Sequence, residues 1–213
     1  MSFADDESMR LPQSLLDAIA PRGSTRSFPT NAILINEGDT TDSLYIVLSG
    51  RVKVYASSDD GREVVLAEYG PGEYFGELSI DGAKRSASIK ALEPCNCRVV
   101  QGSELLEFLA EQPDFAVHLT RKLIRMVRRL TDQVRSIALQ DVYGRMVRVL
   151  HELSEPLGEE RVLRRKLTQQ DIADRVGSSR EMVNRVMKEL TSGGYVTQRD
   201  GRIVIVRKLP SAW

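Results

Sequence analysis

The sequence predicts an α+β fold in which a β-rich first half, a long helix and a small C-terminal domain follow one another. Three observations predict it: turn-like spacing of glycines up to residue 100, an apolar seam over residues 114–140, and two short helical segments joined at Gly177. The expected segments are 1–112, 113–140 and 141–213.

The first segment reads as a small antiparallel jelly roll. Gly38, Gly50, Gly61 and Gly72 stand 12, 11 and 11 residues apart, with short β-rich stretches between them. The stretch 51–55 alternates polar and apolar residues, as a strand with one buried face requires. Strands are expected at 33–35, 44–48, 51–55, 64–66, 87–91 and 97–100.

Cys95 and Cys97 stand at alternating positions, so on a strand both side chains point to one face. Two thiols are too few for a zinc or iron–sulfur site, and we expect buried free cysteines and no metal. The chain also has no nucleophile motif and only two histidines, His118 and His151, so no catalytic residues are assigned and an enzyme is not expected.

A long helix is expected from Pro113 to about Gln140, after a short helix that starts at Gly102. Its seam residues alternate steps of four and three, which is typical of a coiled coil and favours pairing with a second copy of the chain. A helix packed on its own domain explains the same pattern and is the alternative. The seam consists of Leu119, Leu123, Met126, Leu130 and Ile137. The other faces carry Arg121, Lys122, Arg125, Arg128, Arg129 and Arg135.

Residues 167–190 predict a helix-turn-helix. Thr168 is a good N-cap, with Asp171 three residues later at the positive end of the first helix. Ala173 is small where two helices must approach, and Gly177 supplies the turn. Ser178 or Ser179 caps the second helix. The alternative is an ordinary helical hairpin with a solvated charged face.

The second helix carries side chains that can reach DNA base edges beside an apolar stripe. A helix at 142–153 and an exposed loop at 154–160 are expected before the motif. After it, Asp200-Gly201 between two β runs predicts a hairpin, which makes the motif a winged helix-turn-helix. The candidate DNA-binding residues are Thr168, Gln169, Ser179, Arg180, Glu181, Asn184, Arg185, Lys188, Arg199 and Arg202.

The charge distribution agrees with this assignment. Residues 1–110 hold 17 acidic and 10 basic side chains, and residues 111–213 hold 13 acidic and 20 basic ones. The net charge of zero therefore conceals an acidic first half and a basic second half. Because double-stranded DNA is a polyanion, its binding is assigned to the second half.

A second motif lies in the β-rich half, in FGELS (75–79) and KRSAS (84–88). Gly76 lets backbone N–H groups approach an anion, Arg85 can hold a phosphate bidentately, and Ser86 adds a hydroxyl donor. Glu77 can accept a hydrogen bond from a ribose 2′-hydroxyl. An ion pair of Glu77 with Arg85 beside a glycine turn remains the alternative.

The order of jelly roll, GEL cassette with RSA, long helix and winged helix-turn-helix resembles the Crp–Fnr family of bacterial transcription regulators, from about residue 25 onward. The resemblance implies a homodimer that binds a cyclic nucleotide in the β-domain and a palindromic operator with TGTGA-like half-sites. RNA polymerase is a further implied partner. The resemblance assigns the base-reading role to Arg180, Glu181 and Arg185.

The resemblance also assigns the effector site. Where the family's cyclic AMP activator has a Thr-Ser pair on adenine, this chain has Leu130 and Thr131, and a leucine cannot hydrogen-bond a base. Cyclic AMP is the first candidate effector and cyclic di-GMP the second. A constitutive regulator without nucleotide and a regulatory subunit of an enzyme are further alternatives. The effector-site residues are Gly76, Glu77, Leu78, Arg85, Ser86, Leu130 and Thr131.

The N-terminus is acidic and polar, unlike a signal peptide, and the sequence contains no run of eighteen apolar residues. We therefore expect a cytoplasmic protein that does not interact with membranes. The N-terminal cysteine cluster of the Fnr branch is absent from the sequence, which disfavours an iron–sulfur oxygen sensor.

Overall fold

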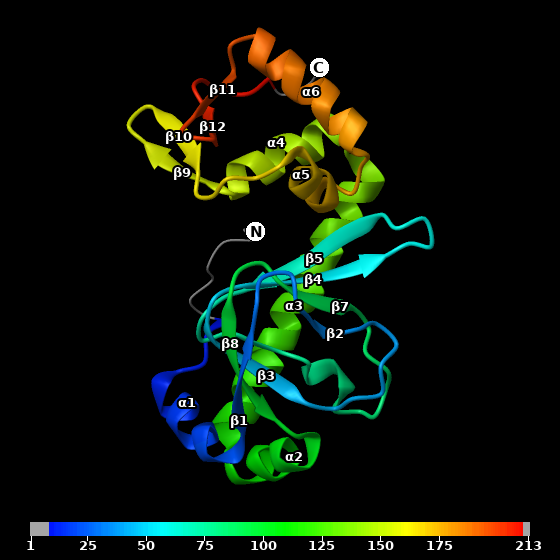
Figure 1. Ribbon diagram of the computed structural model, residues 1–213, viewed down its shortest axis with the longest axis vertical. Helices are drawn as coiled ribbons and strands as arrows, with labels where there is room; N and C mark the ends of the chain where they lie inside the picture. Colours follow the sequence, from blue (N-terminus) through cyan, green and yellow to red (C-terminus); the bar gives the residue numbers. More distant parts are fainter. Residues whose placement is uncertain (1–8, 211–213) are drawn as a thin grey trace. The chain divides into compact units, whose positions relative to one another are not determined.

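The computed structural model describes residues 9–210, which form two compact units (Figure 1). The first unit contains most of the β-rich half and the long helix up to Val127, and the second contains the chain from Arg128 onward together with the segment Ser57–Val64. The α+β class, the N-terminal β-domain, the long helix and the C-terminal helix-turn-helix are confirmed. Each unit is described by itself.

The first unit is a double-layered jelly roll of two four-stranded antiparallel sheets, with strand orders β1-β8-β3-β6 and β2-β7-β4-β5. Three helical segments, α1 (Gln13–Ile19), η2 (Ala20–Arg22) and α2 (Gly102–Glu111), flank it in sequence. The strands are β1 (Ser24–Phe28), β2 (Ile33–Ile35), β3 (Leu44–Ser49), β4 (Val52–Ser57), β5 (Glu63–Tyr69), β6 (Tyr74–Phe75), β7 (Ser88–Ala91) and β8 (Cys95–Val100).

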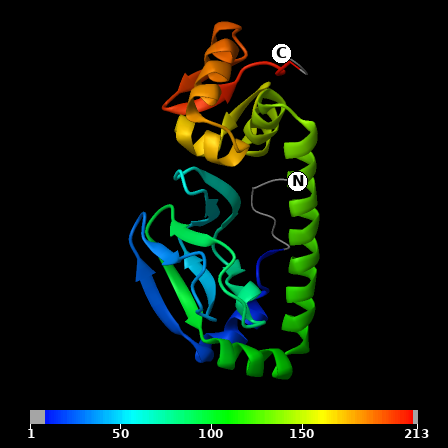
Figure 2. The ribbon, with the colours of Figure 1, turned by 90° about the vertical axis from the view of Figure 1, so that its right-hand side faces the viewer.

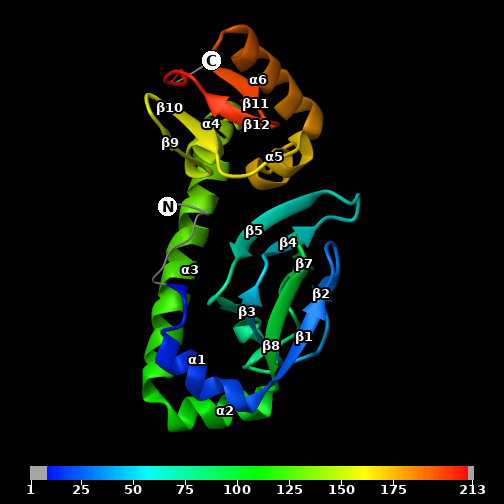
Figure 3. The same cartoon turned by 60° about the vertical axis from the view of Figure 1, so that its left-hand side comes forward.

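The sequence of strand β3 is a continuous apolar run because both of its faces pack against other parts of the domain. Tyr45 and Val47 face the cluster between the sheets, whereas Leu44 and Ile46 face a second cluster with α1, α2 and the start of the long helix. Alternate residues of a strand point to opposite faces, so both faces of β3 are buried. Figure 3 shows α1 and α2 beside the first turns of the long helix.

The structure confirms the predicted turn at Gly50 and the two predicted buried cysteines in β8. Gly50 has φ +82°, and a Cβ there would lie 2.4 Å from the carbonyl oxygen of Pro94. Cys95 and Cys97 are both buried free thiols in the inner cluster. Burial raises the pKa of the Cys97 thiol to about 12, so it remains protonated at neutral pH.

The long helix α3 spans Pro113–Leu139 (Figure 2), and the exposure of its apolar side chains differs from the predicted seam. Leu119 packs against the core of the β-domain and is not part of an exposed seam. Leu130 and Ile137 are exposed as predicted, but the exposed apolar side chains follow a different row. That stripe consists of Val117, Ile124, Val127, Leu130, Val134 and Ile137. Its members form three pairs that are each seven residues apart, 117 with 124, 127 with 134 and 130 with 137, so the stripe keeps a heptad repeat in another register.

After the end of α3, the second unit holds three helices and a four-stranded sheet of order β11-β12-β10-β9. Residues 154–163 form a β-hairpin, so the loop predicted at 154–160 is wrong, although residues 155–159 are exposed as predicted. The Asp200-Gly201 turn is confirmed, with both residues at positive φ. The elements are α4 (Val142–Glu152), β9 (Ser154–Leu157), β10 (Glu160–Leu163), α5 (Gln169–Val176), α6 (Arg180–Ser192), β11 (Val196–Arg199) and β12 (Arg202–Ile205).

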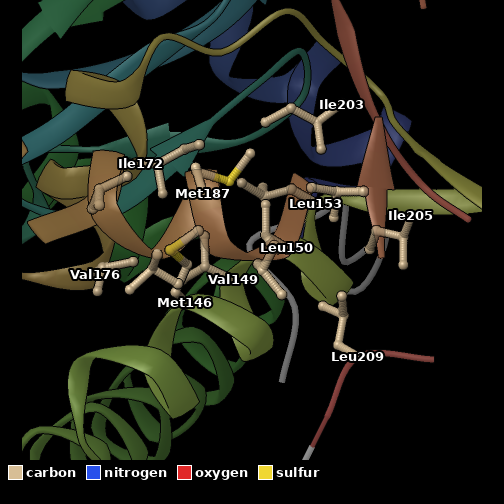
Figure 4. Close-up of a cluster of buried hydrophobic side chains, with 14 of the residues drawn as sticks. Met146, Val149, Leu150, Leu153, Ile172, Val176, Met187, Ile203, Ile205 and Leu209 are labelled. Atoms are coloured by element: carbon tan, nitrogen blue, oxygen red, sulfur yellow. The ribbon is translucent and has the colours of Figure 1, made fainter. Parts of the chain in front are cut away.

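One apolar cluster holds this unit together. Side chains from α4, α5, α6 and the sheet meet in it, and Met146, Leu150 and Ala173 have no exposed surface (Figure 4). Arg145 adds a polar link from α4, because its Nε donates to the carbonyl of Val176 at the end of α5. The three helices therefore form a rigid support for the surface of α6.

No helix within residues 9–210 is long and apolar enough to cross a membrane.

Candidate DNA-binding and effector sites

The helix-turn-helix is built as its capping residues predict. The Thr168 hydroxyl accepts from the N–H of Asp171, and the Asp171 carboxylate accepts from the N–H of Thr168, which completes a capping box. Gly177 ends α5 in the left-handed region at φ +66°. Ser179 caps α6 by accepting from the N–H of Met182, so the second cap is Ser179 and not Ser178.

Thr168→Ala is expected to lower the free energy of unfolding by about 1 kcal/mol, because the N–H of Asp171 loses its side-chain acceptor and the Asp171 carboxylate loses the hydroxyl that donates to it. Urea unfolding followed by circular dichroism measures the change. Thr197→Ala, at a half-buried position outside any cap, is the control and should change stability less. Equal losses for the two variants would contradict the role of the capping box.

Helix α6 separates a buried face from a polar one. Val183, Val186, Met187 and Leu190 face the core. The remaining faces carry the predicted DNA-binding side chains, of which Arg180, Glu181, Arg185 and Lys188 are exposed and Asn184 is half-buried. The first turns of α6 thus present two arginines, a glutamate and an amide on a packed support, which suits base-edge recognition in a major groove.

Local contacts orient part of this polar face. Gln169 on α5 donates to the side-chain carbonyl of Asn184 over 3.1 Å, and Arg185 lies 3.0 Å from the sulfur of Met182. Hydrogen bonds from its own backbone N–H and from the Ser179 hydroxyl hold the pKa of Glu181 below its ordinary value. Glu181 is therefore an ionised acceptor at neutral pH, as recognition of a cytosine amino group requires.

The wing is the β11–β12 hairpin, and its two predicted phosphate-contacting arginines differ in whether a carboxylate already binds them. Arg199 donates two hydrogen bonds to the Glu160 carboxylate on β10, one of them 2.8 Å long. Arg202, its register partner across the hairpin, is exposed. A phosphate contact by Arg199 would compete with Glu160, so Arg202 is the better placed of the two for this predicted role.

In the β-domain, the turn after β6 holds the predicted effector residues. Gly76 has φ +92° and precedes the short 3-10 helix η3 (Glu77–Ser79). A Cβ at position 76 would lie 2.6 Å from the carbonyl oxygen of Ser43 and 2.9 Å from Nη1 of Arg85. Only a glycine allows Arg85 to lie this close to the turn.

Arg85 is 5% exposed and is fixed by three hydrogen bonds. Its Nη1 donates to the Gly76 carbonyl, its Nη2 to the Ser43 carbonyl and its Nε to the Thr41 hydroxyl, over 2.7 to 3.0 Å. Burial lowers its pKa, but a guanidinium stays charged at neutral pH. Since a guanidinium has five N–H groups, Arg85 keeps two for an anion.

Glu77 is not paired with Arg85. Its Oε1 lies 3.0 Å from Nζ of Lys122 on α3, and both side chains are almost completely buried. Lys122 also donates to the carbonyl oxygen of Tyr74, and its ammonium lies 3.8 Å from the ring centroid of Tyr74 and 4.9 Å from that of Tyr69. The ammonium thus sits among a carboxylate, a carbonyl and two aromatic faces.

Lys122 is the residue that sequence reasoning missed, because it was assigned to the charged outer faces of the helix. It has no exposed surface. A signal was present: Phe115 and Leu119, seven and three residues earlier, lie on the same helical face and are packed against the core. A lysine that continues a buried apolar row needs an internal anion.

A second polar contact joins α3 to β6. Nε2 of His118 lies 3.0 Å from the carbonyl oxygen of Arg10 and therefore carries the hydrogen, which leaves Nδ1 to accept from the Tyr74 hydroxyl at 3.2 Å. Burial lowers the pKa of His118, so the ring is neutral at neutral pH. His118 and Lys122, on successive turns of α3, therefore both bond to Tyr74 and attach the helix to β6.

The remaining predicted effector residues are not brought into this cluster. Leu78 is 48% exposed, and Ser86, next to Arg85, is also exposed. Leu130 and Thr131 belong to the second unit, and their predicted contact with a nucleobase stays a prediction. The structure therefore brings together Gly76, Glu77 and Arg85, with Ser86 beside them in sequence.

A phosphate fits the chemistry of this cradle, because Arg85 has two N–H groups left and no side chain stands at Gly76. A carboxylate already balanced by Lys122 can accept a sugar hydroxyl without a second cation. Within residues 9–210, no group of three or more His, Cys, Asp and Glu side chains is arranged to hold a metal ion.

A buried arginine beside a glycine turn in the N-terminal domain and a C-terminal winged helix-turn-helix suit a DNA-binding regulator with a ligand-sensing domain. Comparison with protein families agrees: residues 25–112 match the cyclic nucleotide-binding domain, and residues 144–209 match the Crp-like helix-turn-helix domain. The chain belongs to the Crp–Fnr family of transcription regulators and is not an enzyme.

Among its relatives is the CRP-like cAMP-activated global transcriptional regulator of Mycobacterium tuberculosis, 32% identical over 91% of this chain and 88% of the relative. The cAMP-activated global transcriptional regulator CRP of Pasteurella multocida is 31% identical over 84% of this chain and 88% of its own length. The solved structure of the c-di-GMP responsive global regulator CLP of Xanthomonas campestris has a TM-score of 0.84 at 27% identity and covers 92% of this chain and all of that one.

Proposed function

We propose that this protein is a homodimeric, sequence-specific transcription regulator whose DNA binding is controlled by a cyclic nucleotide in the β-domain. The observation that carries the effector half of the proposal is Arg85, which is buried beside Gly76 with two N–H groups left for a phosphate. In this proposal Ser86 adds a hydroxyl donor to the phosphate and Glu77 accepts from the ribose.

For the DNA half, the first turns of α6 read bases and the surrounding polar groups hold phosphates. Arg180 and Arg185 suit guanine O6 and N7, and Glu181 suits cytosine N4, which agrees with a TGTGA-like half-site. Contacts to the sugar-phosphate backbone position the domain without reading sequence. That role is proposed for Thr168, Gln169, Ser179, Lys188, Arg199 and Arg202, with Asn184 at the border between the two sets.

The dimer is proposed from the exposed apolar stripe of α3. A stripe of six exposed aliphatic side chains is costly for a monomer and is buried when two such helices pair. Pairing also provides the two recognition helices that a palindromic operator needs. RNA polymerase is the proposed partner on DNA, from family membership alone.

Cyclic AMP is the first candidate effector and cyclic di-GMP the second. Several relatives carry cAMP activation in their names, whereas CLP, whose solved structure is very similar, is described as c-di-GMP responsive. Leu130, in place of a hydrogen-bonding side chain, favours the second candidate. Both ligands offer a phosphate for Arg85 and a ribose 2′-hydroxyl for Glu77.

A constitutive regulator is the alternative, and one observation favours it. Arg85 and Glu77 already have protein partners, so the cradle is ordered without a ligand. Effector control requires that the nucleotide bind one arrangement of the dimer better than another, because a ligand with equal affinity for both shifts nothing.

Arg85→Ala is expected to reduce the affinity for the effector by at least about tenfold, because the phosphate loses its charge-assisted hydrogen bonds. Isothermal titration calorimetry with cyclic AMP, cyclic GMP and cyclic di-GMP measures it. Arg62→Ala, an exposed arginine on the β4–β5 hairpin that is bonded to Asp60, is the control. Unchanged affinity in Arg85→Ala would contradict the proposed phosphate site.

A further inference from the structure

Lys122 has a place in the effector site that the family resemblance did not assign to it. Its ammonium contacts one oxygen of Glu77, Oε1, at 3.0 Å. Within residues 9–210, no hydrogen-bond donor contacts the other oxygen, Oε2. Glu77 itself is 6% exposed.

We propose that Lys122 is a positioning residue of the effector site. Its ammonium fixes Oε1 of Glu77 and so orients the carboxylate, which leaves Oε2 to accept a hydrogen bond from the 2′-hydroxyl of a bound ribonucleotide. The proposal rests on the proposed function, since it takes a cyclic nucleotide as the ligand of Arg85 and Glu77.

The first argument is electrostatic. A buried carboxylate without a counter-ion is stabilised in its neutral form, and a neutral carboxyl group is a weaker acceptor for a hydroxyl. Arg85, the other cation near Glu77, directs its guanidinium to Ser43, Gly76 and Thr41. Lys122 is therefore the cation that directly contacts Glu77.

The second argument is geometric. The carbonyl of Tyr74 and the rings of Tyr69 and Tyr74 surround the ammonium and restrict its position. Tyr74 lies in β6, two residues before Gly76, so one short segment of chain carries the acceptors of Lys122 and the phosphate turn. The direction of the Glu77 carboxylate is thereby set by a side chain from α3.

A consequence follows for the long helix. The hydroxyl of a ligand and the ammonium of α3 share one carboxylate, so recognition of the sugar depends on the attachment of α3 to β6. Loss of the Lys122 contact at Oε1 therefore alters the charge and the orientation with which Oε2 meets the ligand hydroxyl.

The test compares a ribonucleotide with its 2′-deoxy analogue. Calorimetry on the full chain first identifies which of cyclic AMP, cyclic GMP and cyclic di-GMP binds most tightly, and then measures the 2′-deoxy form of that nucleotide. The wild type is expected to prefer the ribonucleotide by about tenfold, which is the usual worth of one hydrogen bond to a charged group. In Lys122→Met this preference should fall to less than about twofold, with the loss confined to the ribonucleotide.

Two further variants separate positioning from general damage. Lys122→Arg keeps a cation and should restore part of the preference, whereas Arg121→Met removes an exposed cation from the same turn and should leave the preference intact. Thermal unfolding establishes that each variant is folded. If Lys122→Met does not fold, Lys122→Gln, which keeps a donor without the charge, takes its place in the same comparison and should lower the preference.

A wild-type preference that persists in the folded Lys122 variant would overturn the role of Lys122 and leave the proposed function standing. Failure of all three nucleotides to bind the wild type would overturn both the proposed effector site and this inference. A wild type that binds the ribonucleotide and its 2′-deoxy form equally would also overturn the inference.

Discussion

Replacing Arg180 by alanine is expected to weaken binding to the preferred operator by about tenfold to a hundredfold and to relax the preference at one base of each half-site. Arg180 begins α6, is exposed and sits on a helix whose opposite face is packed against the core. An arginine in this position can form two hydrogen bonds to one guanine, and alanine leaves those acceptors without a protein donor.

Fluorescence anisotropy on a duplex with two TGTGA half-sites, and on duplexes with single substitutions, measures the effect at fixed salt. Arg202→Ala is the matched control. Its exposed side chain on the wing is proposed to contact a phosphate, so its loss should weaken all duplexes similarly and flatten the dependence on salt. If Arg180→Ala behaved like Arg202→Ala, the assignment of α6 as the recognition helix would be wrong.

Val127→Asp is expected to abolish dimer formation. Val127 is 63% exposed and lies in the middle of the apolar stripe of α3. In a two-fold pairing of this stripe both copies of the aspartate would be buried near the seam, and burying unpaired carboxylates costs more than such an interface supplies. Sedimentation velocity should then report the 23.9 kDa protomer in place of twice that mass.

Leu106→Asp is the control for this variant. Leu106 lies on α2 and is 53% exposed, so it introduces the same charge at a similarly exposed apolar position outside the stripe. This variant should remain dimeric and keep its affinity for the palindromic duplex. A monomeric wild type, or a dimer that survives Val127→Asp, would place the interface elsewhere.

The local features that the sequence predicted correctly depend on residues close to one another in the chain. Thr168 with Asp171, Gly177 and Asp200-Gly201 each require a particular backbone conformation or a neighbour within three residues. Caps and turns of this kind can be predicted from sequence because they depend on local backbone conformation and not on contacts with distant segments. Six of the eight jelly-roll strands were predictable because glycine turns separate several of them, whereas β1 (Ser24–Phe28) and the two-residue β6 (Tyr74–Phe75) were not predicted.

The features that were missed depend on contacts between distant segments. The seam of α3 has two apolar rows, and only the packing of Leu119 on the β-domain shows which row is covered. Lys122 looked like one of several cations until Glu77, 45 residues earlier, proved to be its partner. The β9–β10 hairpin contains Pro156 and Gly158, which normally indicate a loop, but its four-residue strands complete a sheet with β12.

The central claim is that occupancy of the β-domain by a cyclic nucleotide changes the affinity of the paired α6 helices for DNA. A titration of the palindromic duplex, followed by anisotropy at constant salt with and without saturating cyclic AMP or cyclic di-GMP, tests it directly. The account predicts that one of these nucleotides changes the Kd for this duplex by tenfold or more, with a smaller change for a scrambled duplex. The same Kd under every condition, or equal affinity for both duplexes, would contradict it.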